Sequence, residues 1–247
     1  MRCKFQLRMI LFMKPFNIQD QWIYPNIQHW TPYILKNLSK INHLYKNNEG
    51  IVLDVGGGLA PISDITNLSD YKYILLDPDI NKLNLCIKPI EKIQGYAENI
   101  PLKDNSIDIL ITSSCLQYIN QYKFFDECRR VLKVGGIIAL HENGPYNPFI
   151  LFARLIQRFI GLFNKEQWKY RNTIKTYYYP KELNGFELYS VIQVGLTTPI
   201  LLYLQILNIK QPPKLLFILN KIDYYLLLIF PFLKKITFLS TVIYIKK

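Results

Sequence analysis

A glycine cluster and two aspartates stand at spacings that suit a nucleotide-like ligand. Asp54 lies in the apolar run 51–55, and the three glycines Gly56–Gly58 follow that run directly. Glycine lets the backbone turn tightly and lets a ligand approach the main chain closely. Asp77 follows the last glycine by 19 residues, a spacing at which an acidic side chain commonly binds the hydroxyls of a ribose. Taken singly, the glycines would suit a tight turn and Asp77 a helix N-cap. Together they predict a site for a ribose-containing cofactor.

Three further side chains are candidates for catalysis. Gln117 and Tyr118 come shortly after the apolar run 107–113, and His141 lies near the end of the run 136–142. The ordinary pKa of histidine, about 6.5, would suit a general base. A structural histidine at a strand end is an equally good interpretation, and neither Gln117 nor Tyr118 is an obvious base.

These residues must be positioned by the elements around them. Between residues 50 and 145, short apolar runs typical of buried strands alternate with segments of helical periodicity. This alternation predicts an α/β fold with a doubly wound, mostly parallel sheet, whose ligands bind at the carboxyl ends of the strands. The predicted strands are 51–55, 71–77, 92–96, 107–113 and 136–142, and the predicted helices are 59–68, 79–87 and 124–133.

Four landmarks follow one another along this region. They are the glycine segment from Asp54 to Ala60, Asp77 in LLDPD, the stretch 95–113 and RRVLKVGG at 129–136. In these landmarks, and over roughly residues 45–145, the sequence resembles the class I S-adenosylmethionine-dependent methyltransferases. A nicotinamide dehydrogenase would usually complete G-x-G-x-x-G with a third glycine, whereas this chain has Pro61 at that position.

The resemblance implies a Rossmann-like sheet of seven strands whose last strand, at 238–247, is antiparallel, and it implies S-adenosylmethionine as the cofactor. The family usually has an aspartate where this chain has Tyr96, so stacking by Tyr96 or an acceptor at Glu98 would have to serve the adenine. A degenerate, non-catalytic cofactor-binding protein is therefore an alternative. The cofactor-binding residues implied by the resemblance are Asp54, Gly56, Gly57, Gly58, Asp77, Pro78, Tyr96, Ala97, Glu98 and Ser113.

The remainder of the chain predicts an extension and a lid. We expect an N-terminal extension over residues 1–48, followed by one methyltransferase domain over 49–247. Long apolar runs predict helical lids within this domain at about 147–180 and 197–236. Their uncharged stretches are shorter than the roughly 18 residues of a membrane span, so we expect them to lie over the acceptor site or on a membrane surface.

The formal net charge of +12 belongs to the flanks of the chain. Residues 50–145 carry 9 basic and 12 acidic side chains, whereas residues 146–247 carry 14 basic and 4 acidic ones. Lysines beside apolar helices are consistent with a cap over the acceptor site or with contact to an anionic membrane surface. Nucleic-acid binding, as in an RNA methyltransferase, is the least favoured interpretation. The first two predict an apolar small molecule, a lipid or a lipid-linked glycan as the acceptor.

Cysteine and histidine spacing predicts a reduced protein without a metal site. The four cysteines show no C-x-x-C pair, and the three histidines lie far from them and from one another. We therefore expect a cytoplasmic protein, peripheral on the inner face of the membrane if the lid binds lipid.

Overall fold

The computed structural model describes most of the chain from residue 50 onward. The described residues are 50–58, 60, 71–144, 146–149, 151–152, 155, 179–201 and 215–247. The predicted extension 1–48, nearly all of the predicted helix 59–68 and most of the predicted lid 147–180 lie outside them. The division into domains therefore stays a prediction.

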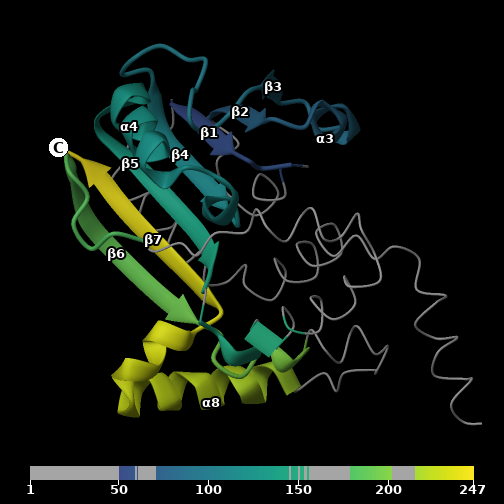
Figure 1. The fold of residues 1–247 in the computed structure, drawn as a ribbon, viewed down its shortest axis with the longest axis vertical. Helices are drawn as coiled ribbons and strands as arrows, with labels where there is room; N and C mark the ends of the chain where they lie inside the picture. The colour runs from purple at the N-terminus through teal and green to yellow at the C-terminus, as the bar shows by residue number, and fades with distance from the viewer. Residues whose placement is uncertain are drawn as a thin grey trace, which may run out of the picture.

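One seven-stranded sheet forms the centre of the described structure (Figure 1). Its strand order is β3-β2-β1-β4-β5-β7-β6. The first five strands in this order pair in parallel, and β7 is antiparallel to both of its neighbours, β5 and β6. This order confirms the predicted Rossmann-like sheet with an antiparallel last strand. The strands are β1 (Ile51–Val55), β2 (Lys72–Asp77), β3 (Glu91–Gln94), β4 (Ile107–Ser113), β5 (Leu132–Asn143), β6 (Phe186–Val194) and β7 (Leu239–Lys246).

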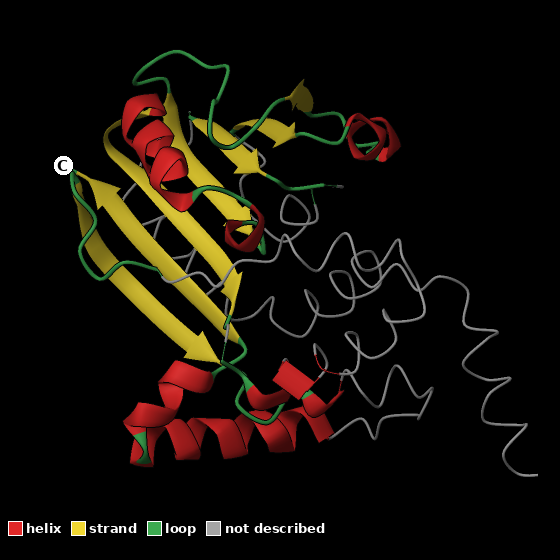
Figure 2. Ribbon diagram, in the orientation of Figure 1, coloured by secondary structure: helices red, strands yellow, loops and turns green. Residues whose placement is uncertain are grey.

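The described helices lie on both faces of the sheet and at one of its ends (Figure 2), since Phe124 and Leu83 belong to the clusters on opposite faces. The helix α4 (Gln121–Val131) begins after Asn120, whose side chain accepts a hydrogen bond from the N–H of Lys123 at 3.4 Å. Its side chains Phe124, Cys128 and Val131 are fully buried because their spacing places them on one face. The described helices are α3 (Ile80–Leu85), α4 (Gln121–Val131) and α8 (Leu215–Ile229), with the 3₁₀ helices η2 (Leu116–Tyr118) and η3 (Pro231–Ile236).

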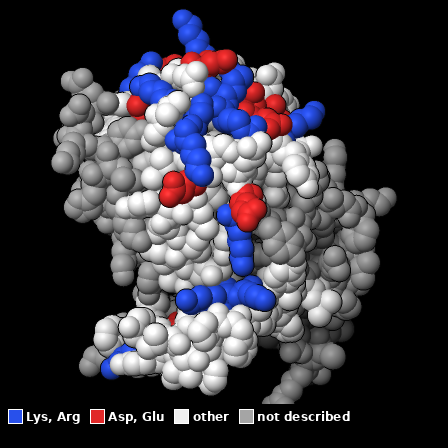
Figure 3. All heavy atoms as spheres, turned by 90° about the vertical axis from the view of Figure 1, so that its left-hand side faces the viewer, with Lys and Arg blue, Asp and Glu red and all other residues white. Residues whose placement is uncertain are grey.

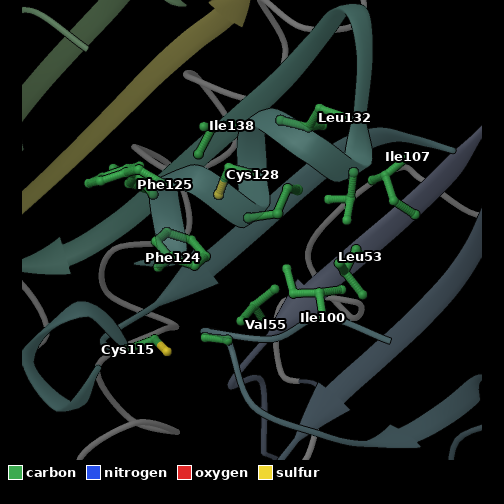
Figure 4. Close-up of a cluster of buried hydrophobic side chains, with 14 of the residues drawn as sticks. Leu53, Val55, Ile100, Ile107, Cys115, Phe124, Phe125, Cys128, Leu132 and Ile138 are labelled. Carbon is green, nitrogen blue, oxygen red and sulfur yellow. The ribbon is translucent and has the colours of Figure 1, made fainter. Parts of the chain in front are cut away.

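Both faces of the sheet carry a hydrophobic core. Leu53 and Val55 of β1 belong to the cluster that includes Phe124 and Cys128 of α4 (Figure 4). Val52 points to the opposite face and belongs to the second cluster. Because strands covered on both faces have no solvent-facing side, their sequences are apolar almost throughout.

The structure changes several of the predicted boundaries. The predicted strand 92–96 is Glu91–Gln94, and the predicted helix 124–133 is Gln121–Val131. We expected the fifth strand to begin at residue 136, after a glycine turn, but β5 begins at Leu132, which pairs with Ile107 before a register shift. Gly135 lies within the strand at a φ of +77°. Within the predicted lid 197–236, the described part holds two helices, α8 and η3, because Pro231 cannot continue α8 and begins η3 instead.

Candidate functional site

The carboxyl ends of β1, β2 and β4 meet at one edge of the sheet (Figure 1). The glycine segment leaves β1 at this edge, Asp77 ends β2, and Ser113 ends β4. Val55, the last residue of β1, is in register with Leu76 of β2 and with Thr112 of β4. The structure thus brings together predicted site residues from three separate parts of the sequence.

The glycine segment is a loop whose backbone and close contacts favour glycine. Gly56 and Gly58 have φ angles of +69° and +58°, which L side chains rarely adopt. A Cβ at Gly57 would lie 2.4 Å from the carboxyl carbon of Asp54. Among the described residues, a Cβ at Gly58 would meet only the Cδ of Lys82, at 3.9 Å. The backbone at Gly58 therefore leaves room for a close approach.

Asp77 connects the two predicted motifs directly. It is 5% exposed, and its Oδ2 accepts from the N–H of Gly58 at 3.0 Å while its Oδ1 accepts from the N–H of Asp79 at 2.9 Å. Each carboxylate oxygen has a second lone pair, so Asp77 can accept two further hydrogen bonds, as a pair of ribose hydroxyls would require. Its interpretation as the cap of α3 is wrong, because the cap is Asp79, which accepts from the N–H of Asn81.

Asp54 supports the glycine loop from inside the protein. The residue is fully buried, and its Oδ2 accepts from the hydroxyl of Tyr73 at 2.7 Å. Its Oδ1 has no hydrogen-bond partner among the described residues. Burial raises the pKa of Asp54 to about 6, although the hydrogen bond from Tyr73 opposes that rise.

The other predicted cofactor residues lie beside β2 and after β3. Tyr96 is 67% exposed, whereas Ala97 is buried. Pro78 is exposed. The Oε1 of Glu98 accepts from the N–H of Asn120 at 2.7 Å, so this carboxylate helps to fix the start of α4. The contacts of these residues with the cofactor stay predictions.

The predicted catalytic residues lie beyond β4 and near the end of β5. Gln117 is buried and donates to the carbonyl of Ser114 at 3.4 Å, while Tyr118 is 39% exposed. His141 is 1% exposed, and neither ring nitrogen has a hydrogen-bond partner among the described residues. We expected an ordinary histidine pKa, but burial lowers the pKa of His141 to about 3. Its ring is therefore neutral at physiological pH. All three catalytic assignments stay predictions.

Glu142 is a buried carboxyl group that the sequence analysis missed. Its Oε1 accepts from the hydroxyl of Thr112 at 2.8 Å and from the N–H of Cys115 at 3.1 Å, so it joins β5 to the end of β4 and to the loop that follows. Burial raises its pKa to about 7, against the opposing effect of these hydrogen bonds. The sequence signal that could have revealed Glu142 was an acidic residue within an apolar strand. A carboxyl group buried there needs hydrogen-bond partners.

Cys115 supports the glycine loop by packing. A Cβ at Gly56 would lie 2.6 Å from the Sγ of Cys115. Burial raises the pKa of Cys115 well above its usual value, so it is an uncharged thiol and a poor nucleophile. In the described part of the chain, no three His, Cys, Asp or Glu side chains are grouped to hold a metal ion.

Comparisons with known proteins agree with this geometry. Residues 53–140 match the family model described as a methyltransferase domain. The chain is 31% identical over 90 residues to a malonyl-[acyl-carrier protein] O-methyltransferase of Dechloromonas aromatica, covering 36% of this chain and 34% of that protein. It is 30% identical over 130 residues to an uncharacterised protein of Methanocaldococcus jannaschii, covering 49% of this chain and 57% of that protein. The matches thus span about a third to somewhat over half of these relatives.

Solved structures share the fold. A protein of Pyrococcus horikoshii superposes with a TM-score of 0.53 at 14% identity and covers 94% of each chain. A SAM-dependent methyltransferase of Archaeoglobus fulgidus gives 0.50 at 13% identity and covers 91% of this chain and 99% of that chain. Together with the family match and the loop held by Asp77, these findings show that the chain carries a class I S-adenosylmethionine-dependent methyltransferase domain.

Proposed function

We propose that this protein transfers a methyl group from S-adenosylmethionine to an apolar small-molecule, lipid or lipid-linked glycan acceptor. The match to the methyltransferase family implies S-adenosylmethionine as the cofactor. The observation that carries the proposal is Asp77, a carboxylate that holds the N–H of Gly58 and keeps lone pairs for further hydrogen bonds.

The described residues fit this cofactor. S-adenosylmethionine supplies an electrophilic methyl group when it is bound. Asp77 would accept from its ribose hydroxyls, and the open side of Gly58 would allow the main chain to approach it. Positioning the acceptor and excluding water would then supply much of the rate acceleration. Glu142 would act as a positioning residue, because it holds the loop that carries Gln117 and Tyr118.

Apolar side chains beyond β5 support an apolar acceptor. Leu151, Phe152 and Leu155 follow the strand closely and are 47%, 55% and 62% exposed. Large exposed apolar side chains commonly mark a surface that binds a ligand or a partner.

Titration calorimetry with S-adenosylmethionine and its demethylated product tests the cofactor. Asp77→Asn removes the charge and one acceptor oxygen, so we expect the affinity to fall by about tenfold or more, as for the loss of charged hydrogen bonds. Asp79→Asn is the matched control, because asparagine also caps helices well, and it should bind as the wild type does. Equal affinities for all three proteins would contradict the proposed site.

Methyl transfer itself is tested with a labelled methyl donor and a lipid extract. Incorporation of label into an organic-soluble product, lost in Asp77→Asn, would support the acceptor class. Cofactor binding without transfer to any lipid or small-molecule fraction would instead favour a non-catalytic binding protein.

A further inference from the structure

The helix α8 buries only a narrow stripe of its surface. Asp223 and Leu227, one turn apart, are 4% and 8% exposed. At about 100° per residue, the exposed side chains of the helix fill a continuous arc of about 160° on the other side. This arc consists of Phe217, Ile218, Lys221, Ile222, Tyr224, Tyr225, Leu228 and Ile229.

The following helix η3 extends this surface and adds positive charge. Phe230 and Phe232 are 43% and 66% exposed, and Lys234 and Lys235 are exposed beside them. We call the exposed arc of α8 together with these four residues the α8–η3 surface. The only acidic residue in this stretch is the buried Asp223, so every exposed charge is positive. Figure 3 shows a largely uncharged area over α8 with Lys and Arg atoms along its border.

The buried carboxylate of Asp223 fixes this surface to the protein. It accepts from the N–H of Leu196 at 2.8 Å, and from both the N–H and the hydroxyl of Thr197, at 2.8 and 2.7 Å. It also accepts from the N–H and the hydroxyl of Thr198, at 3.4 and 3.3 Å. A helix held by this many bonds has no freedom to turn its apolar arc inward, so the arc stays available to a partner.

We propose that the α8–η3 surface binds an anionic membrane and lies in its headgroup region. Apolar and aromatic side chains edged by lysines suit this interface, because the rings and aliphatic groups enter the acyl boundary while the ammonium groups meet anionic lipids. The described residues contain no helix long and apolar enough to cross a membrane. This proposal does not depend on methyl transfer.

The charges argue against two other partners for the α8–η3 surface, a second copy of the protein and the segment 1–49. Lys221 lies inside the apolar arc, so a second copy docked face to face would bring two buried lysines together, whereas a lipid surface lets them reach the headgroups. The segment 1–49 carries 7 basic and 2 acidic residues, so it would be repelled by the lysines of this surface.

Cosedimentation with vesicles tests the proposal. We expect the protein to bind phosphatidylcholine vesicles that contain phosphatidylglycerol at low salt, to bind them less well at high salt, and to bind pure phosphatidylcholine weakly. Leu228→Glu should reduce the partition constant by about tenfold or more. Ile87→Glu is the matched control, since Ile87 is 97% exposed outside the surface, and it should bind normally.

The positive charge is tested separately. Lys234→Gln with Lys235→Gln should lower binding by about tenfold or more and flatten its salt dependence, whereas the same change at Lys103 and Lys181, exposed lysines outside the surface, should have less effect. Cofactor calorimetry on each variant checks the fold and keeps this test separate from that of the proposed function. Absence of vesicle binding at low salt would overturn the proposal, as would a dimer that Leu228→Glu dissociates.

Discussion

Glu142 is a residue whose burial favours its protonated form near neutral pH. Its pKa in the folded protein, about 7, lies above its ordinary value of 4.5, so the folded state holds a proton that the unfolded chain releases more readily. The stability that this proton contributes is complete below about pH 4.5 and is lost as the pH rises through about 7.

Glu142→Gln should remove this part of the pH dependence, because glutamine resembles the protonated carboxyl group in shape. Between pH 4.5 and pH 8, the free energy of unfolding of the variant should rise relative to the wild type by up to about 3 kcal/mol. Urea unfolding at a series of pH values measures it. Glu187→Gln, an exposed change on β6, should leave the profile as it is. If the free energies of unfolding of the wild type and of Glu142→Gln changed with pH in parallel, the raised pKa of Glu142 would be contradicted.

Gly56 combines a positive φ with a close neighbour, and the two costs can be separated. Gly56 and Gly135 have φ angles of +69° and +77°. In the described part of the chain, a Cβ at Gly56 would meet the Sγ of Cys115 at 2.6 Å, whereas a Cβ at Gly135 would meet no other group. Gly135→Ala should destabilise the protein by about 1–2 kcal/mol through backbone strain alone. Gly56→Ala should cost about 1–3 kcal/mol more through overpacking. Thermal unfolding compares the stabilities of the two variants. Equal losses of stability would show that the contact with Cys115 adds no steric cost at Gly56.

Among the elements, α8 depends most on a single side chain. Asp223→Asn replaces an acceptor oxygen with an NH₂ donor that faces other donors, so several bonds to Thr197 and Thr198 should be lost. We expect the amides of α8 to exchange hydrogen at least about tenfold faster, while those of β4 keep their protection. Asp126→Asn, at an exposed ion pair with Arg129, is the control. Unchanged exchange in α8 would contradict its anchoring through Asp223.

The elements also show what the sequence could predict. The runs 51–55 and 107–113 became strands with the predicted bounds, because burial on both faces leaves an uninterrupted apolar pattern. The early start of β5 was missed because it depends on the pairing of Leu132 with Ile107. The meeting of the glycine segment and Asp77 at the strand ends was predictable, since both follow strands at short distances. Glu142 was not, because its partners are 27 and 30 residues away in the sequence.

At the scale of the molecule, charge and apolar surface are separated on the face of the described structure that Figure 3 shows. Acidic and basic side chains gather together at the end of the described structure farthest from α8, whereas the area over α8 is mostly uncharged (Figure 3). The carboxyl end of β5 points toward α8 (Figure 1). A membrane bound at the α8–η3 surface would therefore lie on the side where the acceptor is expected to enter, so that a lipid would have a short path to the site.

The position of β7 has a consequence for the order in which the protein can be made. β7 lies between β5 and β6 although it follows both in the chain. During synthesis, β6 has no adjacent strand until residues 239–246 leave the ribosome, and the apolar helix α8 emerges before them. For that interval the nascent chain exposes both an unpaired strand and an apolar helix, which are features that chaperones recognise and that favour aggregation. Production of this protein should therefore benefit from slow translation and from chaperones that hold the emerging chain.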